Sequence, residues 1–549
     1  MIAGDPARSF WDGCNPQHPH SSRGGGKGAA DDLLAAAANT RIDPLIAMIT
    51  QDDPVSILEK PAENIHLSGG RMLHSIGWTG AATWATQLIT WAYMIVLARM
   101  LTPADFGLVG MANLLLEILT VASEFGVGVA IVMLPDLTEN QMSQLNTVAL
   151  ISGGLLFIVS CAAAYPLGYF FKTSALPAVI IVLSIGLLIL SFKIVPCALL
   201  QREFRFKLLA QIQAAQVMIY AVGAIVSVFW GAGYWSLVIA NLAGVCVATL
   251  LTLRFRRHSF ARPRFSSLRQ SLVFSTHVFS ARLAWYWNTT ADSVVTGRML
   301  GKAALGSYGI AWSLANQPLQ KFADLVTRVV PSYFSRVHDN PAALRDYVLT
   351  ITQVLSLLTL PATLGLALVA DDFVALAFGP KWMAAVTPLR LLAIYAAARS
   401  ITSFFYPLLN VKGQSKFLMW NQVLACTYFT IAFWIGSRWG VGGIALMWPI
   451  LYPLMIVPVY VKLFKQINLS LREYLHVLRP ALTGTIAMIA FVLIVRNILP
   501  THVLYLRLAA EIATGVVSYC LVVLALYFKQ LCRLYTLIQP AQKLALATQ

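Results

Sequence analysis

Polar and ionisable side chains recur at helical spacing inside two segments that are otherwise apolar. In residues 107–131 they fall at positions i, i+4, i+7 and i+11, on one face of a helix; they are Asn113, Glu117, Thr120 and Glu124. Residues 305–329 carry a comparable stripe of Ser313, Gln317, Gln320, Lys321, Asp324 and Arg328. A charge in the middle of a membrane span costs about 2.5–3.5 kcal/mol, so such residues usually face a wet cavity or a partner. We therefore predict that both stripes face one polar cavity.

The acids in these segments are candidates for a gate or for ion coupling. They are Glu117, Glu124, Asp292 and Asp324. A carboxylate held at low dielectric constant can exchange protons near neutral pH. A second interpretation stays open, in which the acids only balance nearby bases. Lys321 and Asp324, at i and i+3, could for example form a fixed ion pair.

The bases inside apolar segments divide in the same way. We expect Arg282 to face the cavity, because no acid lies one helical turn away in its segment, which also contains Asn288. Arg328 lies near the end of its segment and could instead snorkel to the membrane surface. For Arg399, helix packing and cavity lining are equally open interpretations.

Membrane helices must position these residues. The chain has 549 residues, of which 58% are hydrophobic and 11% charged, against about 45–50% and about 25% in soluble domains. Its mean hydropathy is +0.70. This excess is too large for one buried core and excludes a soluble enzyme, a disordered protein and a disulfide scaffold. The seven cysteines are scattered without metal-ligand spacing, so we predict no cofactor and no metal.

Hydropathy predicts about fourteen transmembrane helices, because each needs about 20 apolar residues. Their approximate ranges are 75–97, 107–131, 146–168, 177–199, 211–230, 233–253, 272–296, 305–329, 348–369, 388–410, 417–436, 442–461, 480–498 and 503–527. Cytoplasmic loops are enriched in Lys and Arg. The N-terminal tail and the even-numbered connections hold 26 such residues, and the odd-numbered connections hold eight. This split predicts that both termini are cytoplasmic.

An internal repeat relates the two halves of the chain. Residues 98–110 read ARMLTPADFGLVG and residues 297–309 read GRMLGKAALGSYG, with six identities at an offset of 199. A second match, at an offset of 209, relates Trp230-Gly231 to Trp439-Gly440. Each block of six spans enters from the same side, so the repeats are parallel, and we expect the functional site between them.

The predicted fold is an all-α polytopic membrane protein, in which two parallel six-helix repeats form a two-lobed bundle with two further C-terminal helices. Its expected parts are a tail at 1–71, a first lobe at 72–257, a basic inter-lobe loop at 258–270, a second lobe at 271–470, and two helices with a short cytoplasmic end at 471–549. We expect the tail to be disordered, or to precede the real start of the protein.

Missing motifs narrow the function. The chain contains no GxxxxGK[ST] motif and no HExxH motif, so neither phosphate-loop ATP hydrolysis nor zinc hydrolysis is expected. No odd-numbered connection is much longer than residues 370–387, which disfavours an enzyme that acts outside the membrane. The net charge of +17 lies mostly in short loops and points to anionic lipids rather than nucleic acid. A carrier that moves two lobes remains.

Four segments carry a resemblance to a known family. LARMLTPADFGLVGMANLLLEI at 97–118 and SEFGVGVAIV at 123–132 resemble the start of Wzx-type polysaccharide flippases, which form the polysaccharide transporter branch of the MOP exporter superfamily. LLQREFRFKLLAQIQ at 199–213 and GAGYWSLVIA at 231–240 are similar to that branch as well. The resemblance covers about residues 72–480, and the long N-terminal extension departs from the family pattern.

The resemblance implies a function and a set of partners. A Wzx-type flippase moves a polyprenyl-diphosphate-linked oligosaccharide across the bacterial inner membrane, for surface or exopolysaccharide synthesis. It would work beside glycosyltransferases and a polysaccharide polymerase, with protons or sodium ions as possible coupling ions. The bases would hold the diphosphate, because the forked guanidinium group of Arg binds it in a bidentate manner, and amide side chains would hold the sugar. The expected substrate-binding residues are Arg282, Lys321, Arg328, Arg399, Asn288 and Gln317.

Three alternatives stay open at this point. A multidrug or cation antiporter of a related branch would favour an acidic, aromatic cavity. A flippase for the lipid precursor of peptidoglycan is closer in mechanism. A membrane glycosyltransferase or polymerase belongs to a different class, and the short odd-numbered connections disfavour it.

Overall fold

The fold is given by a computed structural model that describes residues 86–124, 127–133, 137–264, 286–287, 289–316, 341–499 and 504–547. All of them belong to the unit Ser68–Gln549, and the account below concerns that unit alone. These residues form helices joined by short connections, and no strand occurs among them.

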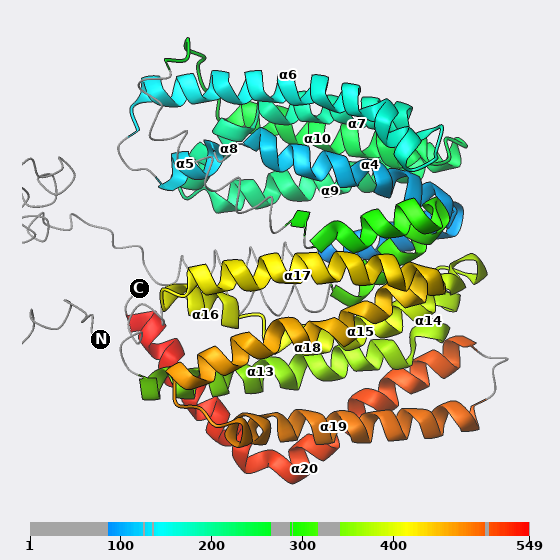
Figure 1. The fold of residues 1–549 in the computed structure, drawn as a ribbon, viewed down its shortest axis with the longest axis vertical. Coiled ribbons are helices and arrows are strands. Elements are labelled where there is room, and N and C mark those ends of the chain that lie inside the picture. Colours follow the sequence, from blue (N-terminus) through cyan, green and yellow to red (C-terminus); the bar gives the residue numbers. More distant parts are fainter. Residues whose placement is uncertain are drawn as a thin grey trace, which may run out of the picture. The chain divides into compact units, whose positions relative to one another are not determined.

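The helices fall into two lobes and a C-terminal hairpin (Figure 1). After helical residues 86–100, the first lobe contains α4 (Pro103–Glu124), α5 (Val127–Met133), α6 (Glu139–Phe170), α7 (Leu176–Ser191), α8 (Ile194–Arg202), α9 (Phe206–Phe229) and α10 (Trp235–Phe255). The second lobe contains helical residues 289–300 and 302–316, then α13 (Pro341–Leu368), α14 (Ala370–Ala377), η1 (Pro380–Ala385), α15 (Val386–Ser400), α16 (Phe405–Val411), α17 (Ser415–Gly436), η2 (Ser437–Trp439) and α18 (Gly440–Gln466). The hairpin consists of α19 (Leu471–Ile498) and α20 (Leu504–Ala547).

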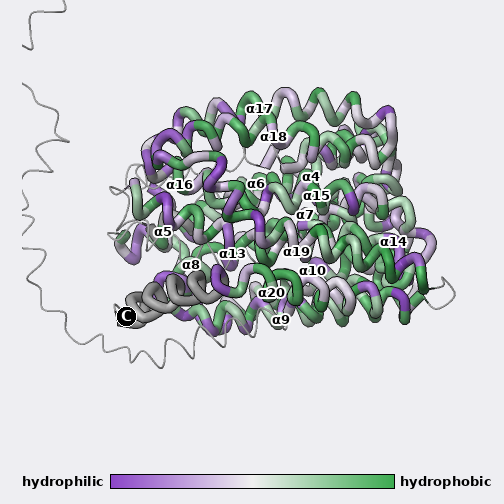
Figure 2. Tube along the Cα trace, turned by 90° about the horizontal axis from the view of Figure 1, so that it is seen from below, coloured by the Kyte–Doolittle hydropathy of each residue, from purple (hydrophilic) through white to green (hydrophobic). Residues whose placement is uncertain are grey.

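The long helices run between two ends of this unit, which we name after a residue at each (Figure 1). The Trp382 end holds η1 and the starts of α4, α10 and α18, and the Lys412 end holds the starts of α6, α9, α17 and α19. Hydrophobic residues cover the helices along their length, whereas hydrophilic residues gather towards the two ends (Figure 2). This distribution fits a bundle whose middle lies in a bilayer.

Within the described ranges, nine stretches are long and apolar enough to cross a membrane, and the bent pair of α7 and α8 would add a tenth. One of the nine, Ser415–Gln466, contains both α17 and α18. The predicted class, an all-α polytopic membrane protein, is therefore confirmed. The count of about fourteen spans and the domain boundaries stay predictions, because residues 1–85, 265–285 and 317–340 lie outside the described residues.

Each lobe has its own core. In the first lobe, α4 and α10 both pack on α7, around small and aliphatic residues such as Leu108, Ile180 and Val238. In the second lobe, α15 and α18 pack together around aromatic residues. Trp382 and Phe405 are fully buried there. The two cores thus differ in the size of the side chains that fill them.

The lobes meet through glycine at the Trp382 end. A Cβ atom on Gly107 would lie 1.6 Å from the carbonyl oxygen of Lys302, and one on Gly306 would lie 1.9 Å from that of Pro103. Gly107 and Gly306, like Pro103 and Lys302, are partners at the repeat offset of 199 residues. The contact is therefore reciprocal, as expected for two repeats related by a local two-fold axis. Only glycine lets the two backbones approach this closely.

Polar contacts reinforce this junction. Arg99, at the end of helical residues 86–100, donates through Nε to the carbonyl oxygen of Ala377 at 2.9 Å. In return, Lys381 Nζ donates to the carbonyl oxygen of Arg99 at 2.8 Å, and Trp382 Nε1 donates to that of Ala98 at 2.8 Å. The bases at this end thus satisfy helix-terminal carbonyl groups of the opposite lobe.

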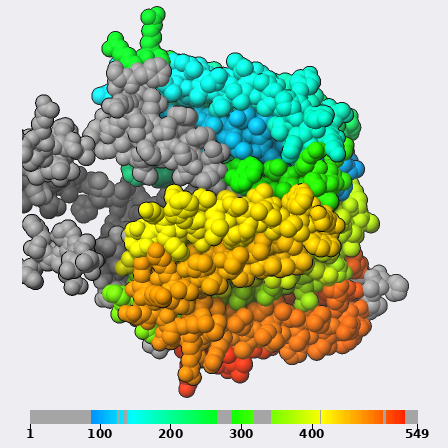
Figure 3. All heavy atoms as spheres, in the orientation of Figure 1, coloured from blue at the N-terminus to red at the C-terminus, as the bar shows by residue number. Residues whose placement is uncertain are grey.

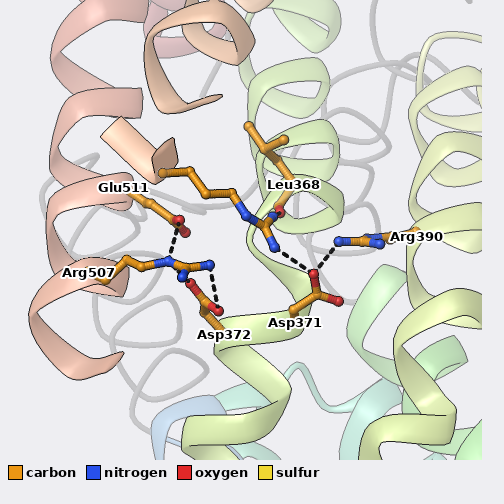
Figure 4. A network of polar contacts seen from close by, with 7 residues as sticks. Leu368, Asp371, Asp372, Arg390, Arg507 and Glu511 are labelled. Carbon is orange, nitrogen blue, oxygen red and sulfur yellow. Dashed lines mark hydrogen bonds and ion pairs between the residues drawn. The ribbon is translucent and has the colours of Figure 1, made fainter. Parts of the chain in front are cut away.

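A network of six charges joins the hairpin to the second lobe (Figure 4). Asp371 accepts hydrogen bonds from Arg390 at 2.5 Å and from Arg496 at 2.7 Å. Arg507 Nε lies 2.7 Å from Asp372 Oδ2 and 3.3 Å from Glu511 Oε1. Arg507 is 7% exposed and Glu511 1%, so this pair is taken out of solvent. The three acids balance the three bases, and the buried members, Asp372, Arg507 and Glu511, need such compensation most.

Three predicted span boundaries are wrong, two of them for a common reason. The span expected at 107–131 ends with α4 at Glu124, and that expected at 177–199 bends by 43° between α7 and α8. A hydropathy average cannot detect a break that has apolar residues on both sides. The span expected at 480–498 begins at Leu471 instead, because Ser470 and Glu473 form a capping box that starts α19 in a polar turn.

Candidate functional site

A cavity of about 430 Å³ lies between the lobes, on the Lys412 side of the glycine contact. The first lobe supplies its wall from helical residues 86–100 and from α4, α9 and α10. The second lobe supplies residues from the helical stretches 289–300 and 302–316. Ligand sites in proteins occupy about 300–1,000 Å³ and favour interfaces between repeats. Size and place therefore make this cavity the candidate site.

Its lining combines aromatic rings with uncharged polar groups. The aromatic residues are Tyr93, Phe106, Tyr220 and Trp312. The uncharged polar residues are Asn113, Thr289, Thr290, Ser293 and Ser313. Rings present flat apolar faces, while hydroxyl and amide groups donate and accept hydrogen bonds. Such a lining suits a ligand that has both apolar faces and many hydroxyl groups.

Glu117 is the one charged side chain among the described lining residues. It lies in the middle of α4, one turn after Asn113, and is exposed towards the cavity. The hydroxyl group of Tyr286 lies within hydrogen-bond reach of Glu117 and also donates to the carbonyl oxygen of Leu114 at 2.7 Å. The second lobe therefore contacts α4 at the position of the acid.

The structure brings part of the two predicted stripes together. Asn113 and Glu117 from the first lobe and Ser313 from the second line the same cavity. Their roles stay predictions. The α4 helix includes Glu124 as its last residue. Six of the predicted site residues lie outside the described residues, namely Arg282, Asn288, Gln317, Lys321, Asp324 and Arg328.

Asp292 lies behind the cavity wall, fully buried at 1% exposure. Its Oδ2 accepts hydrogen bonds from the hydroxyl group of Tyr308 at 2.5 Å and from Trp448 Nε1 at 3.1 Å. Its Oδ1 accepts one from the backbone N–H of Ser293 at 2.6 Å. A buried carboxylate without such donors would be very costly. Three donors from two helical segments and α18 thus enclose this acid.

An aromatic cluster separates Asp292 from the cavity. Trp448 packs on Tyr395 with ring centroids 4.7 Å apart and on Trp312 at 5.3 Å. Trp312 in turn lines the cavity, and so does Ser293, the residue next to Asp292. One layer of side chains therefore lies between the acid and the cavity, so a change at either could reach the other through direct contact.

Arg399 does not line the cavity among the described residues. Its Nη1 donates to Asn316 Oδ1 at 3.4 Å, and its guanidinium group lies over the ring of Tyr395 at 5.9 Å. Both partners belong to the second lobe. Of the two interpretations that the sequence left open, this geometry agrees better with helix packing beside the aromatic cluster.

The sequence did not point to the aromatic residues of the site. Tyr308 lies 16 residues from Asp292 and Trp448 lies 156 residues from it, so no local spacing links the three. The charge network of the hairpin was missed for the same reason. Among the described residues, no group of three or more His, Cys, Asp or Glu side chains could hold a metal ion.

Comparisons with known proteins agree with this architecture. A family model described as polysaccharide biosynthesis protein matches residues 96–387. The chain is 26% identical over 432 residues to the lipopolysaccharide biosynthesis protein WzxC of Escherichia coli (strain K12), covering 75% of this chain and 86% of WzxC. It is 25% identical over 457 residues to the teichuronic acid biosynthesis protein TuaB of Bacillus subtilis (strain 168), covering 82% of this chain and 94% of TuaB.

A solved structure shares the fold. The lipid II flippase MurJ, in an inward closed conformation, superposes with a TM-score of 0.67 at 15% sequence identity. The match covers 83% of this chain and 99% of MurJ. The two-lobed bundle is therefore a fold already known among membrane transporters.

Proposed function

Because the chain belongs to the polysaccharide biosynthesis protein family, whose model matches residues 96–387, we propose that it translocates a lipid-linked oligosaccharide across the bacterial inner membrane. The substrate is an oligosaccharide repeat unit on a polyprenyl diphosphate. Its movement supplies surface or exopolysaccharide synthesis, beside glycosyltransferases and a polymerase. The protein is a multi-pass transporter and performs no bond chemistry in this step.

The lining of the cavity is the observation that carries the proposal. Sugar rings present apolar C–H faces that stack on aromatic side chains, as Tyr93, Tyr220 and Trp312 would allow. Sugar hydroxyl groups need donors and acceptors, which Asn113 and Ser313 offer from opposite lobes. A carrier for an organic cation would need mainly acids, and the described lining holds only Glu117.

The diphosphate and the lipid need separate places. Arg282, Lys321 and Arg328 would hold the diphosphate, with Asn288 and Gln317 beside them for the sugar. Arg399 would act indirectly, by positioning Asn316 and Tyr395. The lipid would remain in the bilayer, reaching the cavity through a gap between the lobes. This arrangement keeps the apolar chain out of water.

Translocation would follow from alternating access. The glycine contact would close the cavity at the Trp382 end, and the split of basic residues predicts that this end lies outside the cytoplasm. Parting of Gly107 from Gly306 would open that end. At the opposite end, Glu124 would pair with one of the bases Arg282, Lys321 and Arg328 when that side closes, and would release it to the diphosphate when that side opens.

Ion coupling would lie at Asp292, with Glu117 and Asp324 as further candidates. The groups around Asp292 are N–H and O–H donors, which stabilise its carboxylate form against the cost of burial. A bound sodium ion would need several oxygen ligands instead. Protonation would weaken the hydrogen bonds from Tyr308 and Trp448, and Trp312 would transmit the change to the cavity.

Reconstitution tests the function directly. Purified protein in liposomes, with a fluorescent polyprenyl-diphosphate oligosaccharide in one leaflet, should expose the label to a membrane-impermeant quencher faster than empty liposomes do. A labelled sugar donor should yield no glycosyl transfer. Reporter fusions after residues 335 and 535 should both report cytoplasm. Transfer of label to a longer glycan, without translocation, would replace this function by that of a polymerase.

A further inference from the structure

A basic strap crosses one end of the first lobe. The strap comprises residues 256–264, which follow α10 at the Lys412 end without regular secondary structure, beginning with Arg256 in an extended conformation. It begins with an ion pair in which Arg256 Nε lies 2.8 Å from Glu203 Oε1. It then passes over the first turns of α6, where it contacts one side chain after another (Figure 3 shows the atoms of this end beside α6).

Three polar side chains of α6, two of them buried, hold the strap in place. Asn146 Nδ2 donates to the carbonyl oxygen of Ser259 at 3.2 Å, and Thr147 Oγ1 donates to that of Ala261 at 2.8 Å. Gln144 Oε1 accepts from the backbone N–H of Arg264 at 3.0 Å. Asn146 and Gln144 are 2% and 3% exposed. These contacts give the strap a fixed path and so fix the positions of its bases at this end of the first lobe.

A groove of about 600 Å³ lies beside the strap. Its floor is apolar and comes from Phe192, Leu250 and Leu253. Phe192 follows the last residue of α7, where the chain bends by 43° into α8. That bend turns α8 away and leaves the side chains of Phe192 and Leu250 exposed. The groove thus has the size of a ligand site and an apolar floor that no described residue covers.

The rim of the groove is positively charged. Arg254 in the last turn of α10 and Arg257 in the strap both line it and are exposed. No described acid forms an ion pair with either of them. Guanidinium groups bind phosphate through paired hydrogen bonds. An apolar floor with two available guanidinium groups at its rim matches a molecule that joins an acyl chain to a phosphate.

We propose that this groove binds an anionic phospholipid of the adjacent leaflet, with its phosphate at Arg254 and Arg257 and an acyl chain along Phe192, Leu250 and Leu253. The groove shares no lining residue with the cavity between the lobes, so it is a different site from that cavity. The inference does not depend on the proposed function. Bound lipid would fix the end of the first lobe from which the inter-lobe connection departs.

Binding to purified full-length protein tests this. The probe is spin-labelled phosphatidylglycerol, titrated into protein in neutral detergent, with spin-labelled phosphatidylcholine as the zwitterionic reference. We expect saturable immobilisation of phosphatidylglycerol, at least tenfold tighter than that of phosphatidylcholine. The double variant Arg254→Gln/Arg257→Gln should lose at least tenfold in affinity. The control Arg205→Gln/Arg262→Gln removes the same charge from exposed bases at this end that do not line the groove, and should stay within twofold.

Two further measurements test whether the apolar floor and the acyl chain contribute to binding. Leu250→Trp fills the floor without changing charge and should also weaken phosphatidylglycerol binding, while circular dichroism and thermal unfolding verify that each variant is folded. Inorganic phosphate at millimolar concentration should not compete, because it lacks the chain. Equal loss in both double variants, equal binding of the two phospholipids, or stronger displacement by a polyprenyl diphosphate than by unlabelled phosphatidylglycerol would each overturn the proposal.

Discussion

The two lobes share a repeat, but equivalent positions in them hold different kinds of side chain. At the repeat offset of 199 residues, Asp292 of the second lobe corresponds to Tyr93 of the first, and Tyr308 corresponds to Val109. Tyr93 packs on Tyr220, with ring centroids 5.2 Å apart, and faces the cavity. The first lobe thus presents an aromatic surface at the position where the second encloses a carboxylate. At equivalent backbone positions, the first lobe therefore has an aromatic residue that faces the cavity and the second lobe has a buried titratable residue.

The lobes also differ in how they are anchored. The hairpin of α19 and α20 packs on α13 and is joined to the second lobe by the charges around Asp371 and Asp372. The first lobe contacts the second at the Trp382 end through glycine, through hydrogen bonds to carbonyl groups, and through the ring contact between Phe106 and Trp382. Among the described residues, no ion pair crosses between the two lobes. We therefore propose that the first lobe moves against a second lobe that the hairpin braces.

The glycine contact is the place where the lobes are equivalent, and its loss should have the largest effect. Gly107→Ala and Gly306→Ala each place a methyl group within 2 Å of a backbone oxygen of the opposite lobe. We expect either change to prevent closure and lower translocation in proteoliposomes at least tenfold. Gly154→Ala, where a Cβ meets nothing within 4 Å, is the control. Strongly unequal effects at Gly107 and Gly306 would contradict the two-fold relation.

Substitutions at the equivalent positions Asp292 and Tyr93 test whether only the second lobe couples transport to protons. Asp292→Asn keeps the volume of the side chain and an acceptor for Tyr308 and Trp448, but it can no longer exchange a proton. Translocation driven by an imposed proton gradient should fall at least tenfold, while substrate binding changes less than twofold. Tyr93→Phe at the equivalent position should leave the response to the gradient intact. Gradient-driven transport by Asp292→Asn at the normal rate would remove the coupling role.

Loss of the charge network that joins the hairpin to the second lobe should lower the stability of the protein more than its rate of transport. Arg507→Ala leaves Asp372 and Glu511 as uncompensated buried charges, which costs about 3 kcal/mol. We expect a lower unfolding midpoint in detergent and faster proteolysis between α19 and α20. Arg345→Ala breaks the more exposed pair with Glu473 and should change little. If both variants unfold alike, the hairpin is not held by its charges.

The smallest expected effect concerns pH at the strap. Burial lowers the pKa of His258 from its usual 6.5, repulsion from Arg256 adds to this, and attraction to Glu139 opposes it. The folded strap thus disfavours the charged imidazole, and stability present above pH 6.5 is lost as the pH falls. Amide exchange at Ala261, corrected for intrinsic rates, should quicken a few-fold between pH 7 and pH 5. His258→Gln should abolish this change, and its persistence in that variant would assign it to another group.

Sequence patterns anticipated the architecture better than the site. Among the described residues, hydropathy located most of the long helices. The repeat between residues 98–110 and 297–309 contains both glycines of the lobe contact, although the repeat alone did not predict that contact. The family resemblance is confirmed by the match over residues 96–387. The start of α19 could have been predicted from Ser470 and Glu473, whose spacing is that of a capping box.

The environment of Asp292 could not have been predicted in this way. Its spacing marked it as an ionisable residue in a span, but whether such a residue faces water or a protein interior depends on partners far away in the chain. Trp448 reaches it from α18 and Tyr308 from the neighbouring helix. Pairings across a bundle leave no periodic trace, so the hydrogen bonds around Asp292 and the charge network around Arg507 emerged only from the fold.

Locking the Trp382 end tests alternating access most directly. In a background without the seven native cysteines, Arg99→Cys and Lys381→Cys would be joined by a short, cleavable bifunctional thiol reagent across a junction where the residues already touch. The joined protein should bind the lipid-linked oligosaccharide but should not translocate it, and cleavage of the reagent should restore translocation. Translocation at an undiminished rate while the link is intact would show that the lobes need not part there, and would contradict the account.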